Sequence, residues 1–305
     1  MAAFNNASNN ATDLSRAGNF EISPYILGLI IAFIAVVLNG FLLLVLAKER
    51  KSFLHMRVTY YIINLGIADF LTGLIILFLA MTRVFRIPIT SICEDLIVLL
   101  NWITMQCSFY TLVMMSIDRL VIVLYSLSWS DILTVRRTVI SIFIFWIISI
   151  AGGIVMYFYQ LETRLAILSF VELSILIFIC NSLFIYPVLR KREKGRFITT
   201  VTSSQTVYSR RVLYPLPYDN MSRVVIILIL VLIITQLPFV IYLQIWLIHH
   251  LSGGSILDMV RTKTFVTGYG YAQSFASLNF AINPIVYAWR VKKYREAFAD
   301  TLCYC

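Results

Sequence analysis

The sequence predicts an all-α membrane protein in which seven transmembrane helices form one bundle. The 305 residues are 60% hydrophobic and only 13% charged, whereas globular chains carry about 25% charged residues. Seven separate apolar runs are each long enough for a spanning helix, which needs about 20 mostly apolar residues. The runs are continuous rather than alternating, so they indicate helices and not the strands of a membrane barrel.

The predicted spans are followed by one further helix. In chain order the spans are residues 24–47, 58–82, 96–123, 138–160, 165–189, 223–248 and 265–289. Residues 1–23 form a polar tail, and residues 290–305 carry apolar side chains at helical spacing opposite basic ones. The apolar side chains are Val291, Tyr294, Phe298 and Leu302. This pattern predicts a short amphipathic helix at the membrane surface, so we expect one domain, the bundle over 24–289, with a tail at each end.

Basic residues predict the orientation of the bundle. Lys and Arg are enriched in cytoplasmic segments, and most of the 25 in this chain fall on one side when the spans are threaded through a bilayer. We therefore expect a multi-pass protein of the plasma membrane with its N-terminus extracellular. Glycosylation sequons at Asn6 and Asn10 agree with an extracellular tail. The net charge of +10 then borders the inner leaflet, and no nucleic-acid partner is expected.

Polar residues interrupt the apolar spans, where isolated charges are costly. Asp69 lies in the middle of the second span, and Asp118 and Arg119 are adjacent near the inner end of the third. Such groups are expected to face the interior of the bundle and to find one another. Pro238 and Pro284 each remove a backbone hydrogen bond in mid-span and are expected to kink the sixth and seventh helices.

One motif in each span carries a resemblance to a known family. In chain order the motifs are Asn39, "LGIAD" ending at Asp69, "IDRLVIVLYSLSW" around Arg119, Trp146, Tyr186, "LPF" at Pro238, and "NPIVY" followed by Tyr294 and Phe298. This ordered set resembles the rhodopsin-like (class A) G-protein-coupled receptors over about residues 24–302. The stretch "NPIVYAWRVKKYREAF" looks like adenosine-receptor tails, and the short second outer loop looks like that of melanocortin receptors.

The resemblance implies a switch that activates a heterotrimeric G protein. Asp118 would hold Arg119 at rest, and activation would release Arg119 toward Tyr186 and Tyr287. Three further residues belong to the same switch: Pro238, Asn283 and Pro284. Leu127 would insert into the G protein, arrestin is a further expected partner, and the input is an extracellular ligand. Cys303 and Cys305 are candidates for palmitoylation, which would tie the last helix to membrane lipid.

Four polar residues match the sodium site of the family: Asp69, Ser108, Asn279 and Asn283. Oxygen ligands suit a hard cation, and one carboxylate offsets its charge. The resemblance therefore implies Na⁺ as an allosteric modulator, and no other cofactor is expected.

Several positions depart from the family pattern, mostly where a ligand would act on the switch. They are Glu94, Leu120, Phe178, Tyr218, Leu232 and Gln236. Glu94 stands where the family has a cysteine, so the neighbouring Cys93 is expected to be unpaired. Tyr218 stands where some members carry an acid that pairs with the arginine of the third helix. A weak resting lock, favouring basal activity, is the expected consequence.

The ligand site is predicted from residues in the outer half of the bundle. The candidates are Asn101, Met105, Glu172, Gln236 and Gln244, and ordinary packing within the bundle is an equal alternative for each. Asn101 stands where amine receptors carry Asp, and Ser277 where opsins carry Lys, so neither a monoamine nor retinal is expected. Glu94 and Asp95 give the mouth an acidic character that favours a basic peptide.

A transporter or channel is the main alternative class of function. Transporters usually contain internal repeats and discontinuous helix pairs, and the sequence shows neither. An enzyme is not expected, because the three histidines, His55, His249 and His250, do not gather at one site and no nucleophile or metal set accompanies them.

Overall fold

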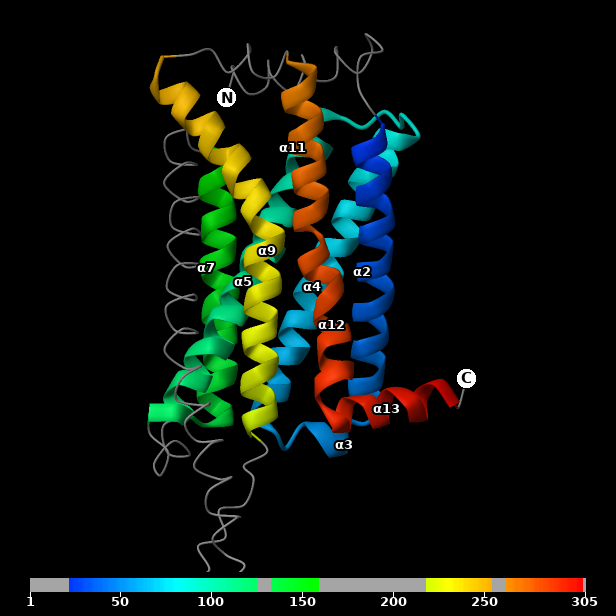
Figure 1. The fold of residues 1–305 in the computed structure, drawn as a ribbon, viewed down its shortest axis with the longest axis vertical. Helices are drawn as coiled ribbons and strands as arrows, with labels where there is room; N and C mark the ends of the chain where they lie inside the picture. The colour runs from blue at the N-terminus through cyan, green and yellow to red at the C-terminus, as the bar shows by residue number, and fades with distance from the viewer. Residues whose placement is uncertain (1–21, 125–132, 159–217, 254–261, 304–305) are drawn as a thin grey trace, which may run out of the picture.

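The computed structural model describes residues 22–124, 133–158, 218–253 and 262–303. The helices in these ranges are α2 (Ser23–Lys48), α3 (Arg50–Phe53), α4 (Arg57–Val84), α5 (Ser91–Leu124), α7 (Val135–Phe158), α9 (Tyr218–Leu251), α11 (Lys263–Ala276), α12 (Leu278–Arg290) and α13 (Lys292–Cys303). Figure 1 shows the long helices side by side along one axis, with α13 lying across one end of the bundle. The predicted helical membrane bundle is confirmed. The predicted fifth span, 165–189, lies outside the described residues.

Five of the described helices are long and apolar enough to cross a membrane. They are Ser23–Lys48, Arg57–Val84, Ser91–Ile122, Val135–Val155 and Val224–Trp246, and each overlaps a predicted span. Large apolar side chains on their outward faces are exposed, among them Phe33 (58%), Leu44 (67%) and Phe143 (66%). Lipid tails are as apolar as these side chains, so such an outer surface is suited to a bilayer and unsuited to water.

The seventh predicted span, 265–289, forms two helices rather than one. α11 ends at Ala276 and α12 begins at Leu278, while Ser277 between them keeps helical angles (φ −66°, ψ −17°). The two helices therefore follow one another along nearly the same line in Figure 1. Pro284 and Pro238 each lie inside a helix that continues past them. The helix of the seventh span is therefore interrupted at Ser277, and not at Pro284, where the sequence predicted a kink.

Contacts between neighbouring helices bring the polar residues of different spans together. α2 packs on α4, α4 on α5 and α5 on α7, while α12 lies against both α2 and α9. Asn39 joins the first span to the last, because its Nδ2 donates to the carbonyl oxygen of Phe280 at 2.8 Å. The faces of α4, α5 and α12 that carry polar groups are thus turned toward one another.

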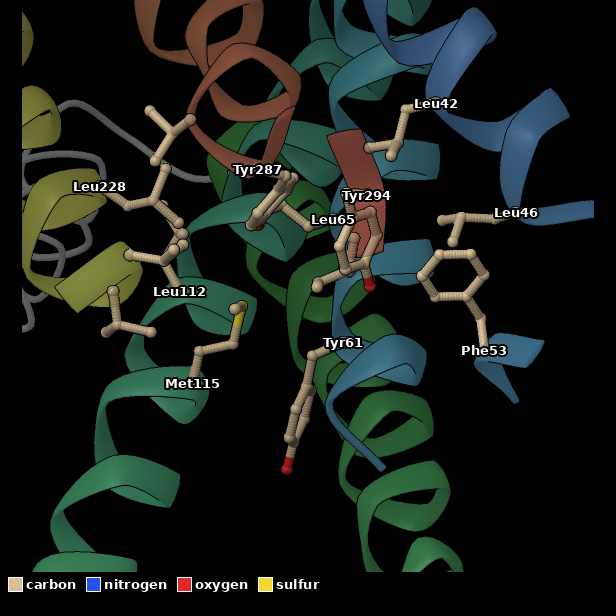
Figure 2. Packing of buried hydrophobic residues seen from close by; sticks show 14 of the residues in the cluster. Leu42, Leu46, Phe53, Tyr61, Leu65, Leu112, Met115, Leu228, Tyr287 and Tyr294 are labelled. Carbon is tan, nitrogen blue, oxygen red and sulfur yellow. The ribbon is translucent and has the colours of Figure 1, made fainter. Parts of the chain in front are cut away.

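The main apolar cluster lies at the end of the bundle that α13 covers. Figure 2 shows Leu42, Leu65, Leu112, Met115 and Leu228 within it, together with aromatic side chains. Tyr294 of α13 lies between Tyr287 and Phe53, with ring centroids 5.9 Å and 4.7 Å away. Lys293 lies over the ring of Phe53 and donates to the carbonyl oxygen of Ser52. These contacts dock α13 on the bundle, although Leu302, expected on its apolar face, is exposed.

Replacing Phe53 with alanine is expected to lower the free energy of unfolding by about 3 kcal/mol, the lower end of the range for a buried Phe→Ala change. Phe53 is fully buried and its ring contacts both Tyr294 and Lys293. Thermal unfolding of the protein in lipid discs measures the effect. Phe85→Ala is the matched control, because Phe85 is 67% exposed and its truncation removes little packing. Equal melting temperatures for the two variants would contradict the docking of α13 through Phe53.

Candidate functional site

A buried carboxylate lies at the centre of the bundle and receives hydrogen bonds from two other helices. Ser108 of α5 donates to Oδ1 of Asp69 at 2.5 Å, and Asn283 of α12 donates to Oδ2 at 2.5 Å. All three side chains are buried, and Asp69 lies on α4. The structure therefore brings together three of the four residues proposed for sodium.

Several buried polar atoms of α2 and α12 have no partner in the described part of the chain. Both amide atoms of Asn279 lack a hydrogen bond, as do Oδ1 of Asn283 and Oδ1 of Asn39. Buried polar groups are nearly always paired with protein, ordered water or an ion. The unpaired atoms include carbonyl oxygens of the kind that coordinate hard cations. The buried carboxylate of Asp69 and the unpaired amide oxygen of Asn283, which donates to Asp69 through its Nδ2, fit a hydrated cation, and Asn279 offers a further unpaired amide oxygen on the same helix.

A second buried charge cluster lies near the C-terminal end of α5. Asp118 Oδ2 is 3.2 Å from Nη2 of Arg119, and both side chains are 1% exposed. Arg57, the first residue of α4, makes two contacts to the same carboxylate: Nη1 to Oδ1 at 2.6 Å and Nη2 to Oδ2 at 3.0 Å. The carboxylate of Asp118 is therefore shared between two arginines, Arg57 and Arg119. Nothing in the sequence distinguishes Arg57 from the other basic residues at the ends of the spans.

The tyrosine of α12 faces α13 in this structure. Tyr287 is fully buried, its ring packs near that of Tyr294, and its hydroxyl has no hydrogen-bond partner among the described residues. Burial raises the pKa of Tyr294 well above its usual range, so this phenol is neutral in the physiological pH range. Tyr186 and Leu127 lie outside the described residues, and so do the side chains of residues 218–223 at the start of α9.

A third polar link holds α4, α5 and α7 in register. The indole N–H of Trp146 donates to Oδ1 of Asn64 at 2.9 Å, and Nδ2 of Asn64 donates to Oγ1 of Thr111 at 2.7 Å. A buried indole N–H usually finds an acceptor, so the sequence indicates that Trp146 has a polar partner but not which residue it is. Asn64 and Thr111 were not singled out from sequence, because nothing in their spacing shows which helix faces they occupy.

The described candidates for the ligand site lie on α5 and α9, with Asn101 and Met105 on α5 and Gln236 and Gln244 on α9. Nε2 of Gln236 donates to the carbonyl oxygen of Ala276 at 3.3 Å, which joins α9 to α11. Oδ1 of Asn101 is buried without a hydrogen-bond partner among the described residues. Met105 is partly buried against a small cluster that includes Phe280, Gln244 is partly buried, and Glu172 lies outside the described residues.

One of the two acidic residues expected near the ligand site, Glu94, is paired with a basic residue. Glu94 forms an ion pair with Arg83 of α4, which offsets its negative charge. Glu94 therefore gives less support for a basic peptide as the ligand. Cys93 is a free thiol, as expected. The Arg83–Glu94 pair connects the C-terminal end of α4 to the N-terminal end of α5.

Comparisons with known proteins agree with this fold. A family model described as "7 transmembrane receptor (rhodopsin family)" matches residues 38–166. Human melanocortin receptor 3 is 22% identical over 275 residues, which cover 87% of this chain and 81% of the relative. Mouse melanocortin receptor 5 is 21% identical over 276 residues, covering 86% and 79%. The crystal structure of squid rhodopsin matches with a TM-score of 0.68 at 18% identity and covers 94% of this chain and 86% of that one.

The helical bundle and its buried polar clusters define a multi-pass membrane protein. In these comparisons the chain is similar to the rhodopsin family of seven-transmembrane receptors over residues 38–166, and to melanocortin receptors over most of its length. The similarity favours a receptor over a transporter, a channel or an enzyme.

Proposed function

We propose that this receptor activates a heterotrimeric G protein by exchanging the partners of Arg119. At rest Asp118 holds Arg119, and in the active state Arg119 moves toward Tyr287 and Tyr186 while Leu127 contacts the G protein. The observation that carries the proposal is the buried Asp118–Arg119 pair, in which the guanidinium lies 3.2 Å from the carboxylate and both side chains are 1% exposed. A buried charge with two alternative sets of partners is a bistable element that a ligand can bias.

The packing of Tyr287 supports the assignment of this arrangement to the resting state. Its hydroxyl is buried with no hydrogen-bond partner among the described residues, which is costly unless another state satisfies it. Asn283 and Pro284 lie one turn before Tyr287 on α12, and Pro238 lies within α9. A movement of these two helices would carry the tyrosine away from Tyr294 and toward Arg119.

Sodium is proposed as the modulator that favours this resting state. Asn283 donates to Asp69 and also belongs to α12, so a cation bound by Asp69, Ser108, Asn279 and Asn283 would hold α12 against α4 and α5. Loss of the cation would free α12 to move. The same residue thus connects the cation site to the tyrosine of the switch.

The orientation and covalent modifications follow from the same proposal. The end of the bundle with Asp118 and α13 faces the cytoplasm, where a G protein and arrestin are available, and the N-terminal tail is extracellular with glycans at Asn6 and Asn10. Cys303 is exposed near the end of α13, and acylation of Cys303 and Cys305 would anchor this helix in plasma-membrane lipid. An extracellular ligand enters from the opposite end, near Asn101, Met105, Gln236, Gln244 and Glu172.

Nucleotide exchange on a panel of purified Gα subunits with Gβγ tests the function. The receptor in lipid discs is expected to accelerate exchange on at least one Gα class without added ligand, because its resting lock is weak. The Asp118→Asn variant, which loosens the hold on Arg119, is expected to accelerate it further. Failure of both proteins to accelerate exchange on any Gα would contradict the proposal.

A further inference from the structure

Arg57 makes the closest contacts to the carboxylate of the switch, although it belongs to none of the motifs that carry the family resemblance. Its guanidinium approaches both carboxylate oxygens of Asp118, at 2.6 Å and 3.0 Å. Nη2 of Arg119 lies 3.2 Å from Oδ2 of the same carboxylate. Charge-assisted hydrogen bonds are stronger than neutral ones, and Arg57 donates one to Asp118 through Nη2, so Arg57 is a strong second partner of this carboxylate.

The position of Arg57 is not explained by its own helix. It is the first residue of α4, and the positive end of the helix dipole disfavours a cation in the first turn. Its side chain is nevertheless only 9% exposed, which removes most of its hydration. Asp118 compensates the charge of Arg57, so the two residues hold one another between α4 and α5.

This arrangement matters when Arg119 leaves. Asp118 is 1% exposed, and a buried carboxylate that loses its only cation is left uncompensated at a large energetic cost. Arg57 is anchored on α4, which packs against α2, α5 and α7, and it does not need to move with Arg119. Asp118 therefore keeps a cationic partner in both states.

We propose that Arg57 is a positioning residue that holds Asp118 after Arg119 has been released, and so lowers the free-energy gap between the resting and active receptor. The inference rests on the proposed role of Arg119 as the moving element. It gives a structural reason for basal activity that is independent of any pairing at the start of α9.

The test compares Arg57→Gln with Arg50→Gln in lipid discs without ligand. Arg50 is exposed in α3 and receives the same substitution at the same end of the bundle. Arg57→Gln is expected to lower basal nucleotide exchange about tenfold, the size expected for loss of one charge-assisted contact, whereas Arg50→Gln leaves it unchanged. Arg57→Lys, which keeps the charge but loses the fork, is expected to fall between wild type and Arg57→Gln. If nucleotide exchange is too slow to measure, the affinity of the receptor for nucleotide-free G protein is expected to rank wild type, Arg57→Lys and Arg57→Gln in the same order.

A double variant separates this role from direct contact with the G protein. In an Asp118→Asn background there is no buried charge to compensate, so Arg57→Gln is expected to have no further effect. An equal loss in both backgrounds, or basal exchange that is unchanged or raised by Arg57→Gln alone, would overturn the inference. The melting temperature of each variant shows whether it folds. If Arg57→Gln does not fold, Arg57→Lys replaces it in the comparison with wild type.

The failure of the switch itself would look different. If Arg119→Ala retains full exchange, the proposed function of Arg119 fails and the role of Arg57 fails with it. If Arg119→Ala is inactive while Arg57→Gln behaves like wild type, the switch stands and only the inference about Arg57 is overturned.

Discussion

Replacing Arg119 with alanine is expected to reduce receptor-stimulated nucleotide exchange at least about 100-fold. In the active state Arg119 would form charge-assisted hydrogen bonds to two tyrosines, each worth about 1.5–3 kcal/mol, and each 1.36 kcal/mol corresponds to a tenfold change in rate. The effect on folding should be much smaller. Truncation of one partner usually strands a buried charge, but here Asp118 remains bound to Arg57 through two contacts.

Two measurements on the same purified protein check this prediction. Nucleotide exchange should fall almost to the receptor-free rate, while the melting temperature stays close to that of wild type. Arg295→Ala is the matched control, because Arg295 is exposed on α13 and loses the same number of charges. A variant that retains exchange, or one that loses activity only because it no longer folds, would count against Arg119 as the moving part of the switch.

Replacing Asp69 with asparagine is expected to abolish the response of the receptor to sodium. In wild type, Na⁺ should lower basal exchange and raise thermal stability relative to K⁺, because a ligand that binds only the resting fold stabilises it. The stabilisation is about 1.4 kcal/mol when sodium is at about ten times its Kd. The asparagine variant lacks the carboxylate that offsets the charge of the cation, so both effects should disappear.

Sodium-free buffer provides a second comparison for the same variant. An unpaired buried carboxylate is more costly than a neutral amide of the same shape, so Asp69→Asn should be at least as stable as wild type in K⁺ alone. Asp300→Asn, at an exposed position on α13, should keep the full sodium response. A sodium response that survives in Asp69→Asn would show that the cation does not bind at Asp69. An equal response to K⁺ would show only an effect of ionic strength.

Part of the candidate site follows from the sequence, because polar residues without a partner are costly inside a bilayer. Asp69 lies in a mostly apolar stretch of its span, whereas Ser108, Asn279 and Asn283 were assigned to the same site through their match to the family motifs. The structure shows two 2.5 Å hydrogen bonds, which join Ser108 and Asn283 to Asp69. The ligand residues were less accessible to this reasoning. Asn101 and Gln244 lie on a face whose neighbours depend on helix rotation, and the family pattern is altered at Gln236.

The sequence by itself determined that this protein is a helical membrane bundle, where its described spans lie, and which side chains are too polar to face lipid. These properties depend on hydropathy and length, which are local. Only the tertiary structure decided that Arg57 shares Asp118 with Arg119, that Tyr287 faces Tyr294, and that Asn64 connects Trp146 to Thr111. Those pairings depend on how each helix is rotated about its axis and shifted along it. Many side chains on all neighbouring helices set that geometry together, and no single stretch of sequence encodes it.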